Sequence, residues 1–473
     1  MKGLKIALGI IVVLVLLAGV YYLYSKKVND QANADVFQAI PETADAVFVI
    51  NIEAFVKLAF SNITDLMELS KKFQKEDRAE SFQNEVQSSG INLSRKVVLF
   101  AEDEVLSVLI PIENTSEFSA YLKKLASNGT LSSISQNEFY SSDLESYITF
   151  SEKICFITMS SKMNISLAQE TWSGITSQNQ RVLEPALEKL QNSDEHFSFY
   201  MKEDEMSARS PFFKHSPGTV LHLSFNDGEI LLSGLFESND QKAKNPFNYS
   251  GESLPKSSIA SVFVNIDTSQ EVWDYWLEDG KMKRLTDDLI HSISDSKELM
   301  NWSGLFNFSI NGAENVEVES ITYSYDDNFK PIEEKTVKTV SQLVYNGNIK
   351  FDSIPSDKLK LDKLLPSQSY YSQRIDSALW FSTAEDSAVE TLPNPNSIHA
   401  FVDFIRLNSV ADKLNIPSSF RAGRLLELAK EAELKVTSIG SKVSTNLVIR
   451  TSDLEKNSLI YLAGEVAPMN LIP

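Results

Sequence analysis

The sequence predicts an α+β fold: an N-terminal transmembrane helix followed by two tandem related domains, each an antiparallel sheet packed with helices. Three observations predict it. The chain begins with a long apolar run, a strand-to-helix transition recurs far apart in the chain, and several pairs of strand-like segments are joined by turn residues. Strands joined by hairpins form antiparallel sheets, and helices laid on such sheets give an α+β fold.

The N-terminal segment predicts a membrane anchor over residues 1–27. Residues 6–24 contain no charged or strongly polar side chain, and lysines flank the run on both sides. At about 1.5 Å of rise per residue, such a helix spans a hydrocarbon layer of roughly 30 Å. We therefore expect the lipid bilayer as a partner through residues 6–24. The N-terminus would lie in the cytoplasm and the body outside it, in the periplasm of a bacterium.

A cleaved signal peptide is the alternative interpretation of this segment. The apolar core of a signal peptide usually runs for about 7 to 15 residues and ends at a small-x-small cleavage site. Ala32-Asn33-Ala34 fits that site, but it lies beyond Lys26 and Lys27, and the apolar core is longer and runs into tyrosines. We therefore favour the retained anchor.

The charge and the cysteine content exclude some classes of function. The formal net charge is −20, which argues against nucleic acid as a partner, because phosphate binding needs clustered Lys and Arg. Cys155 is the single cysteine, so no intrachain disulfide forms. It lies in the apolar segment KICFITM, which predicts a buried side chain and not a nucleophile.

The repeated transition predicts the domain organisation. The segment AVFVINI (46–52) is a strand buried on both faces and leads into an amphipathic helix, and SVFVNI (261–266) leads into a helix capped by Asp267. Similar strands at 196–202 and 399–405, and closing hairpins at 219–237 and 434–453, follow in the same order. We expect a stalk at 28–40, a first α+β domain at 41–240, a linker at 241–257 and a second α+β domain at 258–473.

Local signals predict individual elements within each domain. The segments RKVVLFA, VLSVLIPI, ESYITF and KICFITM predict strands, and Asn114 with Glu117 predicts the start of a helix. Asn226-Asp227-Gly228 predicts a hairpin turn. In the second domain, Asn311-Gly312 and Asn346-Gly347 predict type I′ hairpin turns, for which Asn-Gly is the preferred sequence.

No residue stands out as catalytic, cofactor-binding or metal-binding. The histidines lack the close spacing of zinc ligands, and neither a Gly-rich phosphate loop nor a GxSxG elbow occurs. Two Ser-x-x-Lys matches, Ser253 to Lys256 and Ser294 to Lys297, are accompanied by neither a KTG nor an SDN motif. We therefore expect the histidines to be structural; they are His196, His215, His222, His291 and His399.

The charged clusters are also typical of solvated surface. Glu102-Asp103-Glu104 falls between two strands and Asp326-Asp327-Asn328 at a hairpin tip, and neither has the spacing of a calcium loop. The basic stretch from Lys281 to Arg284 is flanked by acids and resembles a balanced helix surface more than a phosphate site.

The segment IPETADAVFVINIEAF (40–55) resembles the start of uncharacterised single-anchor bacterial envelope proteins that are grouped as domains of unknown function. In that family an I-P-x-x-A-x-x-V phrase follows the anchor and begins the first strand. The resemblance implies a place in the cell envelope and no activity, cofactor or site residue.

Taken together, the sequence predicts a non-enzymatic interaction or scaffolding protein, anchored in the membrane and bound to an envelope protein. Tandem related domains offer similar surfaces to partners and raise their effective concentration. Two alternatives remain open. One is an envelope hydrolase whose site is built from distant residues, and the other is a carrier that shelters an apolar ligand between sheet and helices.

Overall fold

The fold was analysed in a computed structural model of the whole chain. The structure describes the following residues: 31–65, 88–92, 95–102, 105–159, 165–177, 185–202, 219–237, 247, 251–253, 258–269, 284, 288, 302–325, 329–352, 371–375, 377–383, 392–394, 396–414, 428–439 and 442–466.

The chain divides into two compact units. Unit 1 comprises Met1–Glu237 together with Asp453–Pro473, and unit 2 comprises Ser238–Ser452. The last segment of the chain thus returns to the unit formed by the first half. The expected boundaries of two consecutive domains, at 41–240 and 258–473, do not include this return and stay a prediction.

Unit 1 contains an antiparallel sheet built around β1. Along β1, Val47 and Val49 point to one face of the sheet and Phe48 and Ile50 to the other, and both faces are covered. The strands lie in the order β10 (Glu229–Glu237), β9 (Thr219–Asn226), β8 (Phe197–Met201), β1 (Ala46–Asn51), β2 (Lys96–Glu102), β3 (Val105–Pro111), β7 (Ile154–Met159), β6 (Ser146–Phe150), β5 (Glu138–Ser141) and β4 (Ser132–Ser133).

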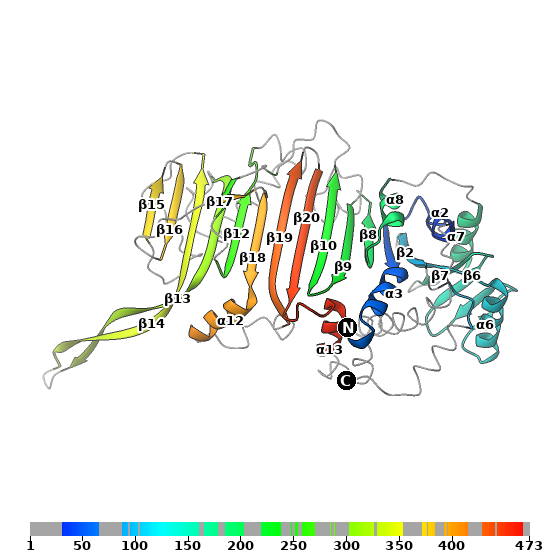
Figure 1. Cartoon of the computed structure of the whole chain (residues 1–473), viewed down its shortest axis with the longest axis horizontal. Helices are drawn as coiled ribbons and strands as arrows, with labels where there is room; N and C mark the ends of the chain where they lie inside the picture. Colours follow the sequence, from blue (N-terminus) through cyan, green and yellow to red (C-terminus); the bar gives the residue numbers. More distant parts are fainter. Residues whose placement is uncertain are drawn as a thin grey trace. The chain divides into compact units, whose positions relative to one another are not determined.

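Helices α3 (Ile52–Ser61) and α13 (Ser458–Val466) cover one face of this sheet (Figure 1). Helix α3 starts directly after β1, where the side chain of Asn51 accepts a hydrogen bond from the Ala54 N–H at 3.3 Å. Such a cap satisfies an amide that the helix leaves unpaired. The two helices and the sheet share a cluster of buried side chains that includes Phe55, Leu58, Phe197, Ile460 and Ala463.

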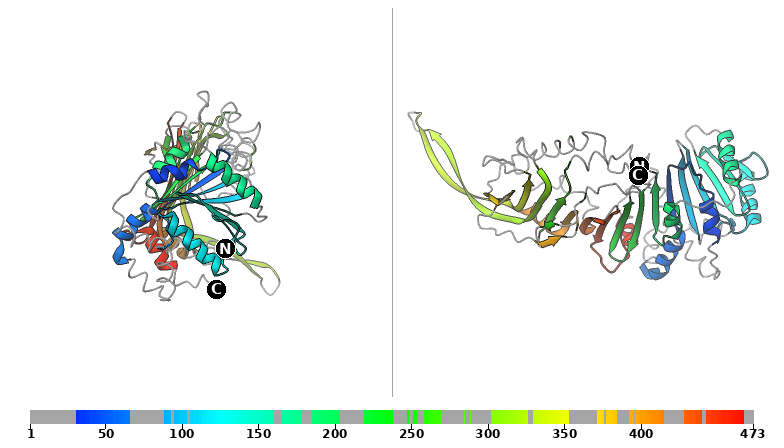
Figure 2. Two further views of the ribbon diagram at one scale, coloured as in Figure 1. Left: turned by 90° about the vertical axis from the view of Figure 1, so that its right-hand side faces the viewer. Right: turned by 90° about the horizontal axis from the view of Figure 1, so that it is seen from above.

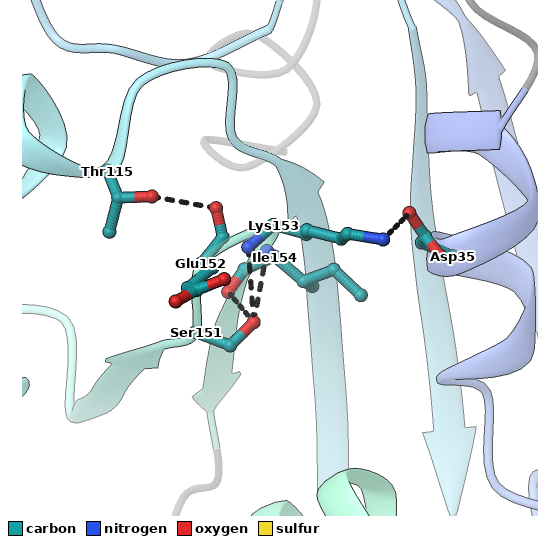
Figure 3. A network of polar contacts seen from close by, with 6 residues as sticks. All are labelled: Asp35, Thr115, Ser151, Glu152, Lys153 and Ile154. Carbon is teal, nitrogen blue, oxygen red and sulfur yellow. Dashed lines mark hydrogen bonds and ion pairs between the residues drawn. The ribbon is translucent and has the colours of Figure 1, made fainter. Parts of the chain in front are cut away.

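Helices α2 (Gln31–Gln38), α7 (Ile165–Ser177) and α8 (Pro185–Asn192) cover the opposite face. Val36, Phe37 and Ile40 are fully buried there, so part of the stretch expected as a stalk contributes to the core of unit 1. An ion pair of 2.9 Å joins Asp35 of α2 to Lys153, in the turn between β6 and β7 (Figure 3). In the same turn the hydroxyl of Ser151 accepts from the Ile154 N–H.

A third cluster packs helix α6 (Thr115–Ser127) against β5, β6 and β7, with α6 visible at the end of unit 1 in Figure 2. The side chain of Asn114 accepts hydrogen bonds from the amides of Ser116 and Glu117 at 3.1 and 3.3 Å, so the predicted start of this helix is confirmed. Cys155 is 1% exposed within this cluster. The prediction of a buried cysteine is confirmed, and burial raises the pKa of its thiol.

In unit 2 the strands also pair into antiparallel sheet, and the described residues of this unit include helix α12 (Phe404–Lys413). A two-stranded sheet of β11 (Gly251–Ser253) and β17 (Leu392–Asn394) accompanies it. The order β9, β8, β1, β2, β3 of unit 1 has a counterpart in β19, β18, β12, β13, β14. The full order is β20 (Lys442–Thr451), β19 (Ala429–Ile439), β18 (Ile398–Asp403), β12 (Ala260–Asn265), β13 (Trp302–Tyr325), β14 (Pro331–Phe351), β16 (Ala378–Ser382) and β15 (Tyr371–Ile375).

Strands β13 and β14 are much longer than their neighbours, and Figures 1 and 2 show that they extend beyond the other strands of unit 2. Their pairing runs without interruption from Gly312↔Val344 to Tyr325↔Pro331. The predicted turns at Asn311-Gly312 and Asn346-Gly347 are therefore wrong. Both pairs lie inside strands, because tertiary pairing along the whole hairpin overrides the local turn preference.

The expected fold class is corrected by the structure. Over the described residues as a whole, antiparallel strands outweigh helices, and in unit 2 they make up most of the described chain. None of the described helices combines the length and apolar character needed to cross a bilayer. Residues 6–24, on which the expected anchor depended, lie outside the described residues.

The expected localisation is corrected with the fold class. A single-pass protein of the bacterial inner membrane with a periplasmic body required the transmembrane helix, and the described structure provides none. The physical reason is that length and apolarity of a segment make a membrane span feasible but do not determine that the span forms.

Candidate functional site

The strongest constellation of polar side chains in unit 1 surrounds Lys96 of β2. Lys96 is 6% exposed. Its Nζ donates to the carbonyl oxygens of Leu190 at 3.2 Å and Ser193 at 2.6 Å, and also to that of Gln191. These carbonyls belong to the end of α8, where a helix leaves its last carbonyls without partners and where a positive charge is favoured.

Burial also changes the proton affinity of this lysine. Loss of hydration lowers the pKa of Lys96 to about 8, against the attraction of Asp194 and Glu53. The three carbonyls match the three N–H donors of an ammonium group. The arrangement thus holds the end of α8 to the sheet.

Next to Lys96, a serine and a histidine face each other across β8 and β9. Ser198 Oγ lies 2.8 Å from His222 Nδ1 and donates to Ser193 Oγ at 3.1 Å. Burial, reinforced by the nearby positive charges of Lys96 and Lys189, lowers the pKa of His222. A hydroxyl beside a neutral imidazole is the starting geometry of a nucleophile and its base.

The surroundings of this pair favour a structural role. Ser198 is 3% exposed, and its hydroxyl is shared between His222 and Ser193. An attacking hydroxyl must be reachable by a substrate carbonyl, whereas here the end of α8 lies over it. We interpret the cluster as the polar attachment of α8 to the sheet.

The other histidines also make structural contacts where the structure describes them. His196 packs edge-on against Phe55 and Phe225, and burial lowers its pKa to about 4. In unit 2, His399 Nε2 lies 2.9 Å from Glu433, which also pairs with Lys435. Burial opposes ionisation of Glu433, but hydrogen bonds from Lys435 and His399 outweigh it and hold its pKa below the ordinary value. His215 and His291 lie outside the described residues.

The remaining sequence candidates do not assemble into a site. Glu102 ends β2, whereas Asp103, Glu104 and the cluster at 326–328 lie outside the described residues. Ser253 lies in β11, and Lys256, Ser294 and Lys297 lie outside the described part. Within the described ranges, no group of three or more His, Cys, Asp or Glu residues is placed to hold a metal ion.

The most distinctive exposed feature is the distal part of the long hairpin, residues 312–325 of β13 and 331–344 of β14, which we call the arm. In the described chain the outer edge of β13 pairs with β12 only as far as Ile310, and the outer edge of β14 pairs with β16 only from Asn346. Both edges of the arm therefore present backbone donors and acceptors along their length.

The arm and its tip also expose large hydrophobic side chains. Eight of them are between 43% and 86% exposed: Val318, Ile321, Tyr323, Tyr325, Phe329, Ile332, Val337 and Val340. Exposed apolar groups gathered on one element are typical of interaction surfaces.

A shallow groove of about 420 Å³ lies on one face of the sheet in unit 2. Val262 lines it, with Phe308 and Ala400 directly opposite on the neighbouring strands. The lining is almost entirely apolar: Ala260, Ser261, Val262, Phe308, Ile310, Ala400, Phe401, Val402, Ala432, Leu434 and Leu447.

The chain matches no protein-family model and no curated protein. Among solved structures it is similar to TP0453. Crystal form I gives 11% identity and a TM-score of 0.29 over 47% of this chain and 82% of that one, and crystal form III gives 12% and 0.29 over 47% and 84%. A TM-score this low does not establish a common fold, and nothing about function is inferred from it.

Proposed function

We propose that the protein is a non-enzymatic interaction protein that binds a partner protein through the arm. One observation supports this most directly: the arm continues for fourteen residue pairs, from Gly312↔Val344 to Tyr325↔Pro331, with both edges unpaired in the described chain. A partner in extended conformation can add a strand to such an edge, and the exposed side chains supply specificity.

The arm gives little to the stability of its own unit. Residues 331–340 are all exposed, and an isolated two-stranded hairpin is marginally stable in water. A protein that keeps a long ribbon with exposed apolar side chains in solvent risks aggregation. A binding role explains why the ribbon is present.

The test is photo-crosslinking from the arm of the full-length protein in its native cells. A photoreactive phenylalanine derivative replaces Tyr323 or Tyr325, which are 60% and 66% exposed, and in a matched control it replaces Tyr371, which is 48% exposed on β15. The two arm positions should yield a discrete adduct with another protein that Tyr371 does not yield. No adduct from the arm, or the same adducts from Tyr371, would refute the proposal.

The groove of unit 2 favours a second candidate function, the carriage of an apolar ligand. Pockets for such ligands are lined mainly by apolar side chains, as this groove is. An apolar fluorescent probe should bind the wild-type protein, and Val262→Asp should weaken binding at least tenfold. The control is Val318→Asp, at a valine of similar exposure on the arm. Equal binding by both variants would exclude the groove.

A further inference from the structure

The outer edge of β14 in the arm carries a sequence that is complementary to itself. Residues 332–340 read IEEKTVKTV and all are exposed. If a second copy of the strand lies antiparallel to the first with Thr336 opposite Thr336, each Glu334 faces Lys338 of the second copy and each Ile332 faces Val340. Two opposite-charge pairs and two apolar pairs form at once.

We propose that two copies of this chain associate through their arms, with β14 of one copy pairing with β14 of the other in the register centred on Thr336. The proposal rests on the proposed function because it also takes the arm to be a binding surface, and it adds a second copy of the chain as a binding partner. The pairing is isologous, so it closes after two copies. It joins two ribbons into a four-stranded sheet.

The charges of the arm favour this partner. Among the described residues, neither Lys335 nor Lys338 has an acidic partner within its own chain. Glu334 uses Oε1 to accept from the Ser324 hydroxyl at 3.1 Å, which leaves Oε2 for an ammonium group. Directly opposite charges on neighbouring strands stabilise a sheet, and like charges destabilise it.

The same rule selects the register. Shifting the centre to Lys335 or Lys338 would place a lysine opposite itself, and a centre at Glu334 would place that acid opposite itself. A centre at Val337 places no acid opposite a lysine. Moving the centre of the pairing by one residue moves the partner of each residue by two, which keeps the side chains on the same face. Among these neighbouring registers, the one centred on Thr336 best matches the charges.

The other edge of the arm does not offer this complementarity. The arm segment of β13 carries Glu314, Glu317 and Glu319 and no basic residue, so pairing it with its own copy would gain no ion pair. The edge of β14 also has room for a neighbour, because Pro331 of the second copy would lie opposite Ser341. The pairing of β14 with β16 begins only at Asn346.

Charge reversal tests the register by sedimentation of the full-length protein. Wild type should be dimeric. Glu334→Lys and Lys338→Glu should each weaken association about tenfold or more, because each puts like charges opposite each other twice. The double variant, which exchanges the two charges, should restore the dimer. The control Glu319→Lys, on the other edge, should leave it unchanged.

A cysteine placed on the symmetry axis gives a second, independent measurement. Thr336→Cys should form a covalent dimer with a short bis-maleimide, because the two copies of residue 336 are adjacent. Thr339→Cys should not, since its two copies lie about 20 Å apart at roughly 3.3 Å per residue. The native Cys155 is buried and serves as the unreactive background.

The outcomes separate this inference from the proposed function. A monomeric wild type, a dimer that survives both single charge reversals, or equal crosslinking from residues 336 and 339 would each overturn the β14 pairing. Adducts between the arm and another protein would still support the proposed function in those cases. A dimer without any such adduct would support the pairing and refute the proposed partner binding.

Discussion

At the scale of one residue, Lys96 shows how a buried lysine can attach the end of a helix to a sheet through hydrogen bonds. In Lys96→Met the carbonyls at the end of α8 lose their donor, and we expect a loss of about 1–3 kcal/mol in the free energy of unfolding at pH 7. The loss would appear in urea titrations followed by circular dichroism.

The pH dependence measures what burial of the charged form of Lys96 costs. Burial lowers the pKa of Lys96 from 10.5 to about 8, so between these values the unfolded chain binds more protons, and the lysine's contribution rises with pH. The difference between wild type and Lys96→Met should therefore widen from pH 8 toward pH 10.5. A constant difference would contradict the burial of a charged amine.

His196 gives a prediction of the same kind on the acid side. Its pKa in the folded protein is about 4, below the ordinary 6.5, so the unfolded chain binds the extra proton in this window and stability falls as the pH drops from 6.5 to 4. A shift of this size corresponds to about 3 kcal/mol.

His196→Phe should remove this acid sensitivity while keeping an aromatic ring between Phe55 and Phe225. The variant loses the acceptor for the Phe225 N–H, which costs about 1 kcal/mol at pH 7. Urea titrations of both proteins at pH 6.5, 5.5 and 4.5 would compare the slopes. Equal slopes would mean that His196 does not stay neutral in the folded state.

These residues also show which contacts could be predicted from the sequence. The Asn114 cap was predictable because the donors are the amides two and three residues away. The role of Lys96 was not, because its carbonyl partners lie 94 to 97 residues further along the chain. Its only local signal is a lysine at the start of an apolar strand.

At the scale of an element, the two Asn-Gly pairs of the long hairpin have different surroundings. A methyl group on Gly347 would lie 2.2 Å from the Phe381 ring, which is 1% exposed, whereas one on Gly312 would meet no heavy atom within 4 Å. Gly347→Ala should therefore cost about 1–3 kcal/mol by overpacking.

Gly312→Ala is the matched control, because it makes the same change in the same hairpin. It should leave the unfolding free energy within about 0.5 kcal/mol or raise it slightly, since glycine is unfavourable inside a strand. Chemical denaturation measures both variants. A smaller cost at Gly347 than at Gly312 would contradict the close approach to Phe381.

The hairpin marks the limit of prediction for elements. Strands β2, β3, β6 and β7 were identified from apolar segments, because burial on both faces leaves a direct mark on composition. A hairpin tip was expected at Asp326-Asp327-Asn328, but the length of the arm was missed, since its alternating Val, Glu, Thr and Lys residues are exposed on both faces and the nearby Asn-Gly pairs satisfied a rule for turns. Only the pairing of β13 with β14 over their full length decides against those turns.

At the scale of the whole molecule, the return of the chain to unit 1 predicts where its last helix matters. Ile460 of α13 is 6% exposed and packs in the cluster with Phe55 and Leu58 of α3. Ile460→Ala should cost about 2–4 kcal/mol. Ile405→Ala, at an isoleucine of α12 that is 54% exposed, should change stability by less than about 0.5 kcal/mol.

Hydrogen exchange would locate the effect of Ile460→Ala. Amides of β8 and β9 should lose protection, while those of β18 and β19 in unit 2 should keep theirs, because α13 packs on the sheet of unit 1. An equal loss in both units would contradict the division of the chain. No sequence pattern indicated this return, since α13 follows the last strand as any terminal helix would.

The order of biosynthesis gives this return a consequence for the nascent polypeptide. A ribosome adds about 5–20 residues per second, so α13 emerges on the order of tens of seconds after the strands of unit 1 on which it rests. Until α13 emerges, Phe55 and Leu58 lack the side chains of α13 that pack on them. A chaperone can bind the apolar surface that is exposed during this time. Unit 1 is therefore the first unit to emerge from the ribosome and the last to complete its core.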